Sequence, residues 1–144
     1  MSRLLKELYT DPSIGEILRK NPELAQQIVN EYGKLFDYAR FIDVWDRITS
    51  AVGVSSEIAN IIAPYIGISP DILEEVIEMV PKAPFMYMYY GKTKDVEGLL
   101  YFILAELESF IPVLGDLIDF ENIYTDRVLE WTKKKIREWY KEYH

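Results

Sequence analysis

The chain has 144 residues, of which 49% are hydrophobic and 28% charged, and its formal net charge is −8. These proportions are typical of a globular protein with a real core. There is no cysteine and the only histidine is His144, which excludes disulfides, thiolate zinc sites and cysteine nucleophiles and leaves no internal imidazole for acid–base catalysis.

The negative charge is unevenly distributed along the chain. Residues 50–126 hold 3 basic and 13 acidic side chains, whereas residues 127–144 hold 6 basic and 3 acidic ones. An acidic body repels the phosphates of DNA and RNA, so nucleic acid is not expected as a partner. The absence of cysteine and of a secretory signal favours a cytoplasmic protein. Scarce Gln and Asn, with abundant Glu and Lys, are typical of thermophile proteins.

Three X-Pro pairs predict helix starts, because a short polar side chain can accept a bond from a free N–H and Pro fits the first helical position. The pairs are Asp11-Pro12, Asn21-Pro22 and Ser69-Pro70. The first two separate short helices over residues 2–9 and 12–20 from a long one that begins at Pro22.

The long helix is predicted to run from Pro22 to Ala51, across Gly33. Its apolar residues recur at steps of three, four and seven, which predicts one buried stripe, and Trp45 on this stripe is expected to pack in the core. Asp43 and Arg47 lie off the stripe and have the spacing of an ion pair on a solvated face. The stripe consists of Leu24, Ile28, Leu35, Tyr38, Ile42, Trp45 and Ile48.

Two shorter amphipathic helices are predicted after Gly53. Pro64 should kink or end the first of them. The second follows Ser69-Pro70, and its outer face carries acidic residues, after which Pro81 and Pro84 should stop helical structure. The apolar stripe of the first helix is Val54, Ile58, Ile61, Ile62, Tyr65 and Ile66, and that of the second is Ile72, Leu73, Val76, Ile77 and Val80.

Six large side chains follow one another at Phe85, Met86, Tyr87, Met88, Tyr89 and Tyr90. The pattern is ambiguous between strand and helix. Either geometry turns some of the six side chains outward, and Met and Tyr are suited to adaptable contacts. The segment therefore either threads the core or forms an interaction surface, and we predict an intermolecular contact.

A turn is predicted at residues 91–94, followed by a helix over about 95–111. Gly91-Lys92-Thr93 looks like the end of a phosphate-binding loop, but that loop requires a glycine where Met86 stands. The helix is apolar nearly all round, which is typical of the middle of a bundle or of an oligomer interface.

A tight corner is predicted at residues 112–116, and a last helix runs from about 119 or 122 to 143. Its predicted buried stripe is Leu129, Thr132, Ile136, Trp139 and Tyr143. Lys133, Lys134 and Lys135 should face solvent. Basic and aromatic residues together could also suit an anionic membrane surface.

No constellation of catalytic residues is found in the sequence. Glu75 and Glu78 have helical i, i+3 spacing and Glu106 lies in an apolar helix, but carboxylate metal sites in bundles pair glutamates with histidines that this chain lacks. We therefore predict no catalytic, metal-binding or cofactor-binding residues and no cofactor.

The sequence as a whole predicts a single all-α domain, a compact bundle of five to seven helices with short connections over residues 1–144. The predicted function is that of a non-catalytic helical interaction or assembly module that self-associates as a homo-oligomer, with another protein as the second possible partner. The alternative is a peripheral membrane protein, and a carboxylate-based metal enzyme is the third possibility.

Overall fold

The computed structural model describes residues 2–50, 54–107 and 122–143, and the regular structure in these ranges is entirely α-helical. The predicted all-α bundle is therefore confirmed. Seven of the eight described helices correspond to predicted ones, and the eighth contains residues 85–90. The helices are α1 (Arg3–Tyr9), α2 (Pro12–Lys20), α3 (Pro22–Ser50), α4 (Val54–Ile66), α5 (Pro70–Met79), α6 (Lys82–Thr93), α7 (Val96–Leu107) and α8 (Ile123–Tyr143).

The three predicted helix starts are confirmed, and two of them have the predicted side-chain cap. The Asp11 carboxylate accepts a hydrogen bond from the backbone N–H of Ser13 at 3.1 Å, and the Ser69 hydroxyl accepts one from the N–H of Ile72 at 3.3 Å. Asn21 differs, because its side-chain amide donates to the carbonyl of Ile17 at 2.8 Å and so closes α2 instead of capping α3.

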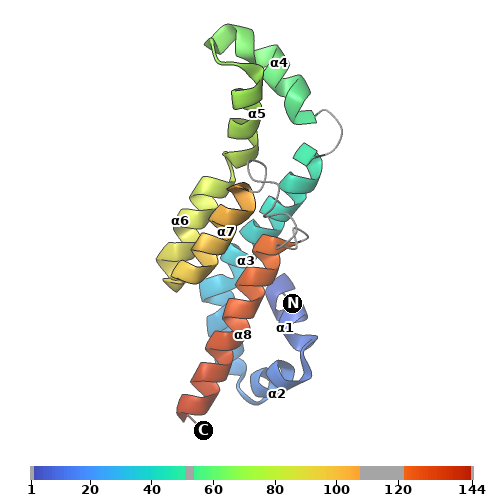
Figure 1. The fold of residues 1–144 in the computed structure, drawn as a ribbon. Helices are drawn as coiled ribbons and strands as arrows, with labels where there is room; N and C mark the ends of the chain where they lie inside the picture. The colour runs from blue at the N-terminus through green and yellow to red at the C-terminus, as the bar shows by residue number, and fades with distance from the viewer. Residues whose placement is uncertain (1, 51–53, 108–121, 144) are drawn as a thin grey trace.

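Helix α3 is the central element and packs against α1, α2, α6 and α8 (Figure 1). It is continuous across Gly33, as predicted, up to Ser50, and Ala51 lies outside the described residues. A glycine in a helix costs only about 1 kcal/mol relative to alanine. Burying a side chain such as Leu35 or Phe36, both 0% exposed, contributes roughly 1.5–3 kcal/mol, so packing outweighs the glycine.

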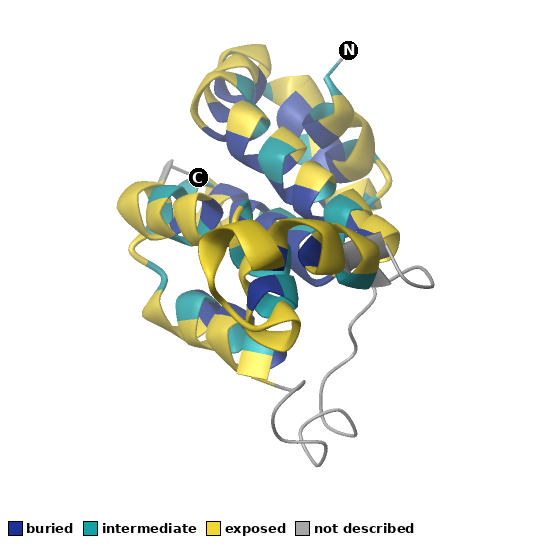
Figure 2. Ribbon diagram, turned by 90° about the horizontal axis from the view of Figure 1, so that it is seen from above, coloured by how far each residue is buried: buried dark blue, intermediate teal, exposed yellow. Residues whose placement is uncertain are grey.

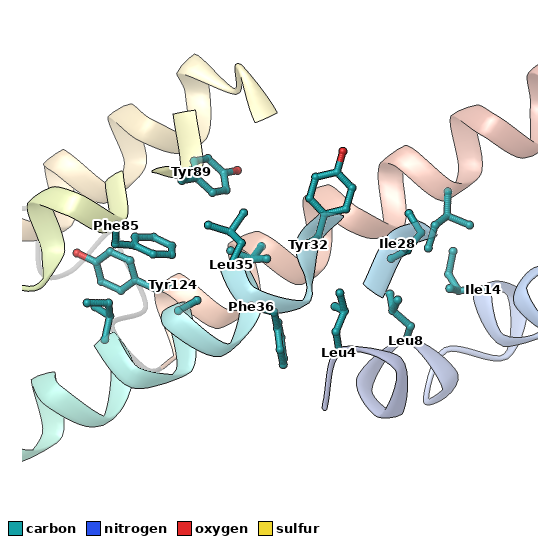
Figure 3. Packing of buried hydrophobic residues seen from close by; sticks show 14 of the residues in the cluster. Leu4, Leu8, Ile14, Ile28, Tyr32, Leu35, Phe36, Phe85, Tyr89 and Tyr124 are labelled. Atoms are coloured by element: carbon teal, nitrogen blue, oxygen red, sulfur yellow. The ribbon is translucent and has the colours of Figure 1, made fainter. Parts of the chain in front are cut away.

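The main core is one continuous cluster to which every helix except α4 and α5 contributes. Leu4, Leu8 and Ile14 form an aliphatic end, and aromatic rings fill the opposite end (Figure 3). There Phe102 stacks on Tyr124 with ring centroids 4.7 Å apart, and Phe85 meets Tyr124 edge-on at 5.3 Å.

The C-terminal half of α3 departs from the predicted stripe. Trp45 is only half-buried and Ile48 is 50% exposed, because this half of the helix extends past the body of the bundle (Figure 1). Asp43 was expected on a solvated face but is 5% exposed. Its carboxylate is buried because it binds the start of α8.

Helix α5 ends at Met79, just before Pro81, as predicted, but α6 begins at Lys82 and Pro84 does not stop it. Pro84 stands in the first turn, where the backbone N–H has no partner within the helix, so proline is tolerated there. The predicted turn at 91–94 is also wrong, since the helix continues to Thr93. It ends at Lys94, whose φ of 55° is left-handed and whose N–H donates to the carbonyl of Tyr90 at 2.8 Å.

Helices α7 and α8 complete the bundle beside α6 and α3. On α7, Phe102 and Ala105 are buried, but Leu100 and Leu104 are exposed, so the outer face of this helix is apolar. On α8, Thr132 and Ile136 are buried as predicted. The predicted end of the α7 helix at 111, the corner at 112–116 and an α8 start at 119 lie outside the described residues.

Helices α4 and α5 pair with each other and project from one end of the bundle (Figure 1). Pro64 lies inside α4, near its end, and does not stop it before Ile66. The turn follows at Gly67, whose φ of 75° favours glycine and whose N–H donates to the carbonyl of Ala63 at 3.0 Å. We call α4 and α5 the hairpin, and the other six helices the body.

Candidate partner-binding surface

The hairpin has a core of its own, and that core is small. It consists of Ala59, Ala63 and Leu73, with Ile77 half-buried against them. Two alanines and one leucine bury little apolar area, and hydrophobic stabilisation is roughly proportional to that area. The hairpin therefore leaves most of its large apolar side chains unburied.

Exposed residues dominate the hairpin, as Figure 2 shows from above. Tyr65 is 89% and Ile61 68% exposed. Single exposed apolar residues are normal on protein surfaces, but a contiguous group of them marks an interaction site. The exposed apolar residues of the hairpin are Ile58, Ile61, Ile62, Tyr65, Ile66, Ile68, Ile72, Val76 and Val80.

A groove of about 440 Å³ lies where α5 meets α6 and α7. Its walls are apolar except for two acidic side chains, Glu75 from α5 and Glu106 from α7. The apolar walls are formed by Ile72, Val76, Met79, Val80, Ala83 and Leu107. We call this the α5–α7 groove, and it connects the exposed face of the hairpin to the body.

Two hydrogen bonds fix the C-terminal end of the hairpin to the body. The Trp45 indole N–H donates to the carbonyl of Glu78 at 3.3 Å, and the Tyr38 hydroxyl donates to the carbonyl of Pro81 at 2.8 Å. Directly after them, Lys82 at the start of α6 binds α3 and α7 through its ammonium group. These links explain why Trp45 is half-buried, since it lies between α3 and the end of α5.

Lys82 is 4% exposed and lies in a buried ion cluster between α3, α6 and α7. Its Nζ atom is 2.5 Å from Asp46 and 2.8 Å from Glu106, and the Tyr124 hydroxyl donates to the other carboxylate oxygen of Glu106. Burial alone would lower the pKa of the Lys82 ammonium, but Glu106 and Asp46 outweigh burial and raise it. Lys82 therefore stays protonated, which suits an anchor rather than a nucleophile.

Asp43 on α3 binds the N-terminal end of α8. Its carboxylate accepts hydrogen bonds from the backbone N–H groups of Tyr124 at 3.3 Å and Thr125 at 3.0 Å, and from the Thr125 hydroxyl. It thus caps α8 from a helix 81 residues earlier in the chain. Burial raises the pKa of Asp43 despite these bonds. No sequence signal predicts this role, because the cap does not precede the helix it serves.

The structure divides the predicted interaction segment 85–90 into two groups. Phe85 and Tyr89 are 0% exposed, so they belong to the core and cannot contact a partner, which corrects the prediction for these two residues. Met86 and Met88 are half-buried against the core. Only Tyr87, at 84% exposed, and Tyr90, at 39%, face outward. The physical reason is that helical geometry places residues 85 and 89 on one face.

The described residues offer little for catalysis or metal binding. Within them, no group of three or more His, Asp or Glu side chains has the geometry to hold a metal ion. Glu75 and Glu106 both line the α5–α7 groove, but Glu106 is bonded to Lys82. Over the same residues, no helix is long and apolar enough to cross a membrane.

A second polar cluster lies at the start of α7. Asp95 accepts hydrogen bonds from the Tyr89 hydroxyl at 2.6 Å, the Gly98 N–H at 3.1 Å and the Arg127 guanidinium at 3.0 Å. Burial opposes ionisation of Asp95, but these three donors outweigh it and lower the pKa. The cluster joins α6, α7 and α8 and leaves its side chains engaged with one another.

No protein-family profile, characterised protein or solved structure shows significant similarity to this chain. The candidate surface therefore depends on geometry alone. Among the described residues, the exposed apolar face of the hairpin combines the most exposed aliphatic side chains with an adjoining groove.

Proposed function

We propose that this protein is a non-catalytic interaction module that binds an apolar helical segment of a polypeptide in the α5–α7 groove. The observation that carries the proposal is the exposed apolar stripe of α5, with Ile72 60%, Val76 47% and Val80 62% exposed. These residues recur every four positions, which is the spacing by which a helix presents one face to a partner.

The groove supports helix binding in preference to catalysis. Its lining is apolar with two carboxylates, which suits the burial of Leu-like side chains. The hydrogen bonds from Trp45 to Glu78 and from Tyr38 to Pro81 hold the C-terminal end of α5 in place relative to the body. A preformed groove lowers the entropic cost of binding.

The proposal is tested with a labelled, uncharged amphipathic peptide of Leu and Gln, about 16 residues long so that it spans four helical turns. Fluorescence anisotropy should show saturable binding to the wild-type chain. The double variant Ile72→Gln/Val76→Gln should weaken binding at least about tenfold. Gln is a good helix former, so the hairpin should keep its helicity, which circular dichroism checks.

A matched double variant compares the two candidate surfaces directly. Tyr87→Gln/Tyr90→Gln changes the outward residues of the segment that the sequence predicted as the interface. If this variant loses binding and the α5 variant keeps it, the contact lies on α6 and the groove assignment is wrong. If neither loses binding, the peptide binds elsewhere and the proposal fails.

Self-association is the form of this function that the sequence favoured, and light scattering over a range of concentrations measures it. A mass that rises with concentration in the wild type and stays monomeric in Ile72→Gln/Val76→Gln would identify a second copy as the partner. Flotation with vesicles tests the membrane alternative, which the sequence assigns to residues 85–90 or the last helix and which therefore requires lipid binding that the α5 variant retains.

A further inference from the structure

We infer that the segment bound in the α5–α7 groove is a basic amphipathic helix of another protein, with Lys or Arg residues flanking an apolar stripe. This inference rests on the proposed function and adds the chemistry of the partner. Three observations carry it: the charge of the hairpin, the position of carboxylates in the groove, and the orientation of the chain's own basic helix.

The hairpin carries charge of one sign only. Residues 54–80 contain five acidic side chains and no Lys or Arg. The nearest cation in the chain, Lys82, is 4% exposed and is neutralised by Asp46 and Glu106. The five acidic residues are Glu57, Asp71, Glu74, Glu75 and Glu78. A partner docking on this surface therefore meets a negative field.

The carboxylates flank the apolar floor of the groove. Glu75 lies between Ile72 and Val76 in the lining, and Glu74 and Glu78 lie on the same helix within one turn of it. A helix that places its apolar stripe against Val76 would present its flanking residues to these carboxylates. Lys and Arg at those flanking positions complement the charge.

Among the described residues, the most basic helix of a second copy, α8, has no free apolar stripe to dock. Two hairpins packed face to face would bring like charges together, which is destabilising. The basic helix α8 buries its own apolar stripe, with Thr132 and Ile136 both 0% exposed. Its outer face, which carries Lys134 and Lys135, is polar. The observations thus favour a basic helix from a different protein.

Three labelled peptides of equal length test the inference by fluorescence anisotropy. They share one apolar stripe of Leu and carry Lys, Gln or Glu at every flanking position. The Lys peptide should bind about tenfold tighter than the Gln peptide and the Glu peptide at least about tenfold more weakly, because two or three exposed ion pairs together give a difference of this size. Added salt should reduce the differences in affinity between the three peptides, because it screens exposed charges.

Paired variants localise the charge effect. Glu74→Gln/Glu75→Gln removes two carboxylates from α5, and Glu130→Gln/Glu138→Gln removes two from the exposed face of α8, so the net charge changes equally. The α5 variant should lose most of the preference for the Lys peptide over the Gln peptide. The α8 variant should keep it.

The outcomes separate the inference from the proposed function. Equal binding of the Lys and Gln peptides, both lost in Ile72→Gln/Val76→Gln, would overturn the basic partner and leave the groove function intact. Equal loss in the two carboxylate variants would show attraction by net charge only, and would also overturn the inference. If no peptide binds the wild type, both the inference and the proposed function fail. If the wild type self-associates through the groove, the inference of a different basic protein fails, but the proposed function of the groove remains.

Discussion

The body and the hairpin use the same kinds of side chain but bury them to different extents. In the body, Phe85 and Tyr89 on α6 are 0% exposed and contact other rings. On the hairpin, Tyr65 is 89% exposed, and the local core consists of small residues. The comparison teaches that the body is stabilised by its own packing, while the hairpin leaves most of its large apolar side chains exposed among the described residues.

Phe85→Ala and Tyr65→Ala form the sharpest pair for this comparison. Removing the buried Phe85 ring should lower the free energy of unfolding by about 3–5 kcal/mol, because it leaves a cavity among Tyr38, Phe102 and Tyr124. Removing the exposed Tyr65 ring should change it by less than about 0.5 kcal/mol. Urea unfolding followed by circular dichroism measures both. A loss above about 2 kcal/mol in Tyr65→Ala would contradict the described exposure of the hairpin.

Alkaline pH should unfold the body through its buried tyrosines. Burial raises the pKa of Tyr124 and of Tyr89, so in the folded protein both pKa values exceed the ordinary tyrosine value of 10.0. The two buried, un-ionised rings contribute fully to the free energy of unfolding below pH 10. Above pH 10 each ring loses about 1.4 kcal/mol of this contribution per pH unit, which amounts to about 3 kcal/mol for the two rings at pH 11. The chain has 11 tyrosines, and only the part of the tyrosinate absorbance that comes from buried rings should appear together with the loss of helical circular dichroism. Tyrosinate absorbance from all 11 rings in a fully helical protein would argue against this burial.

Lys82→Met tests the junction between the two regions. The variant leaves Asp46 and Glu106 without their shared cation, and removing one member of a buried ion cluster costs about 3–5 kcal/mol. We expect about 3 kcal/mol, because the Asp46 side chain is 38% exposed and water can partly compensate. The triple variant Lys82→Met/Asp46→Leu/Glu106→Leu should recover part of the loss. No recovery would show that the ions serve more than mutual neutralisation.

Gly98→Ala probes a close approach inside the body. A Cβ atom at this position would lie 2.7 Å from the Tyr89 hydroxyl and 2.8 Å from Arg127 Nε. Overpacking of this kind costs about 1–3 kcal/mol. Gly91→Ala provides the control, since a Cβ there meets nothing within 4 Å and should stabilise the exposed helix slightly. Equal midpoints of thermal unfolding for the two variants would contradict the described packing.

The sequence predicted the helices well because the signals for them are local. Asp11 and Ser69 cap the turns that follow them directly, and the stripe through α3 depends only on spacing within one helix. The start of α6 was missed because Pro84 was taken as a helix breaker, although its place in the first turn makes it harmless. The effect of a proline on a helix thus depends on its position within that helix, which the sequence pattern did not give for Pro84.

The candidate surface was harder to predict because burial depends on tertiary packing. The stripes of α4 and α5 look like those of core helices, and periodicity cannot tell whether a second layer covers them. Phe85 and Tyr87 illustrate the same limit, since both belong to one apolar run and end on opposite faces of α6. The role of Asp43 depends on a helix 81 residues away, beyond the range of any local pattern.

The attachment of the hairpin has a consequence for how this chain could vary in length. The path leaves the body at the end of α3 and returns at Lys82, whose side chain touches Asp46 on that same helix. The hairpin therefore leaves and rejoins the body at neighbouring points. Insertions and deletions between two such points are tolerated well, because they do not move the rest of the body. A homologue with a longer, shorter or absent hairpin could keep the same body, so the proposed binding surface could change without a change in the main core.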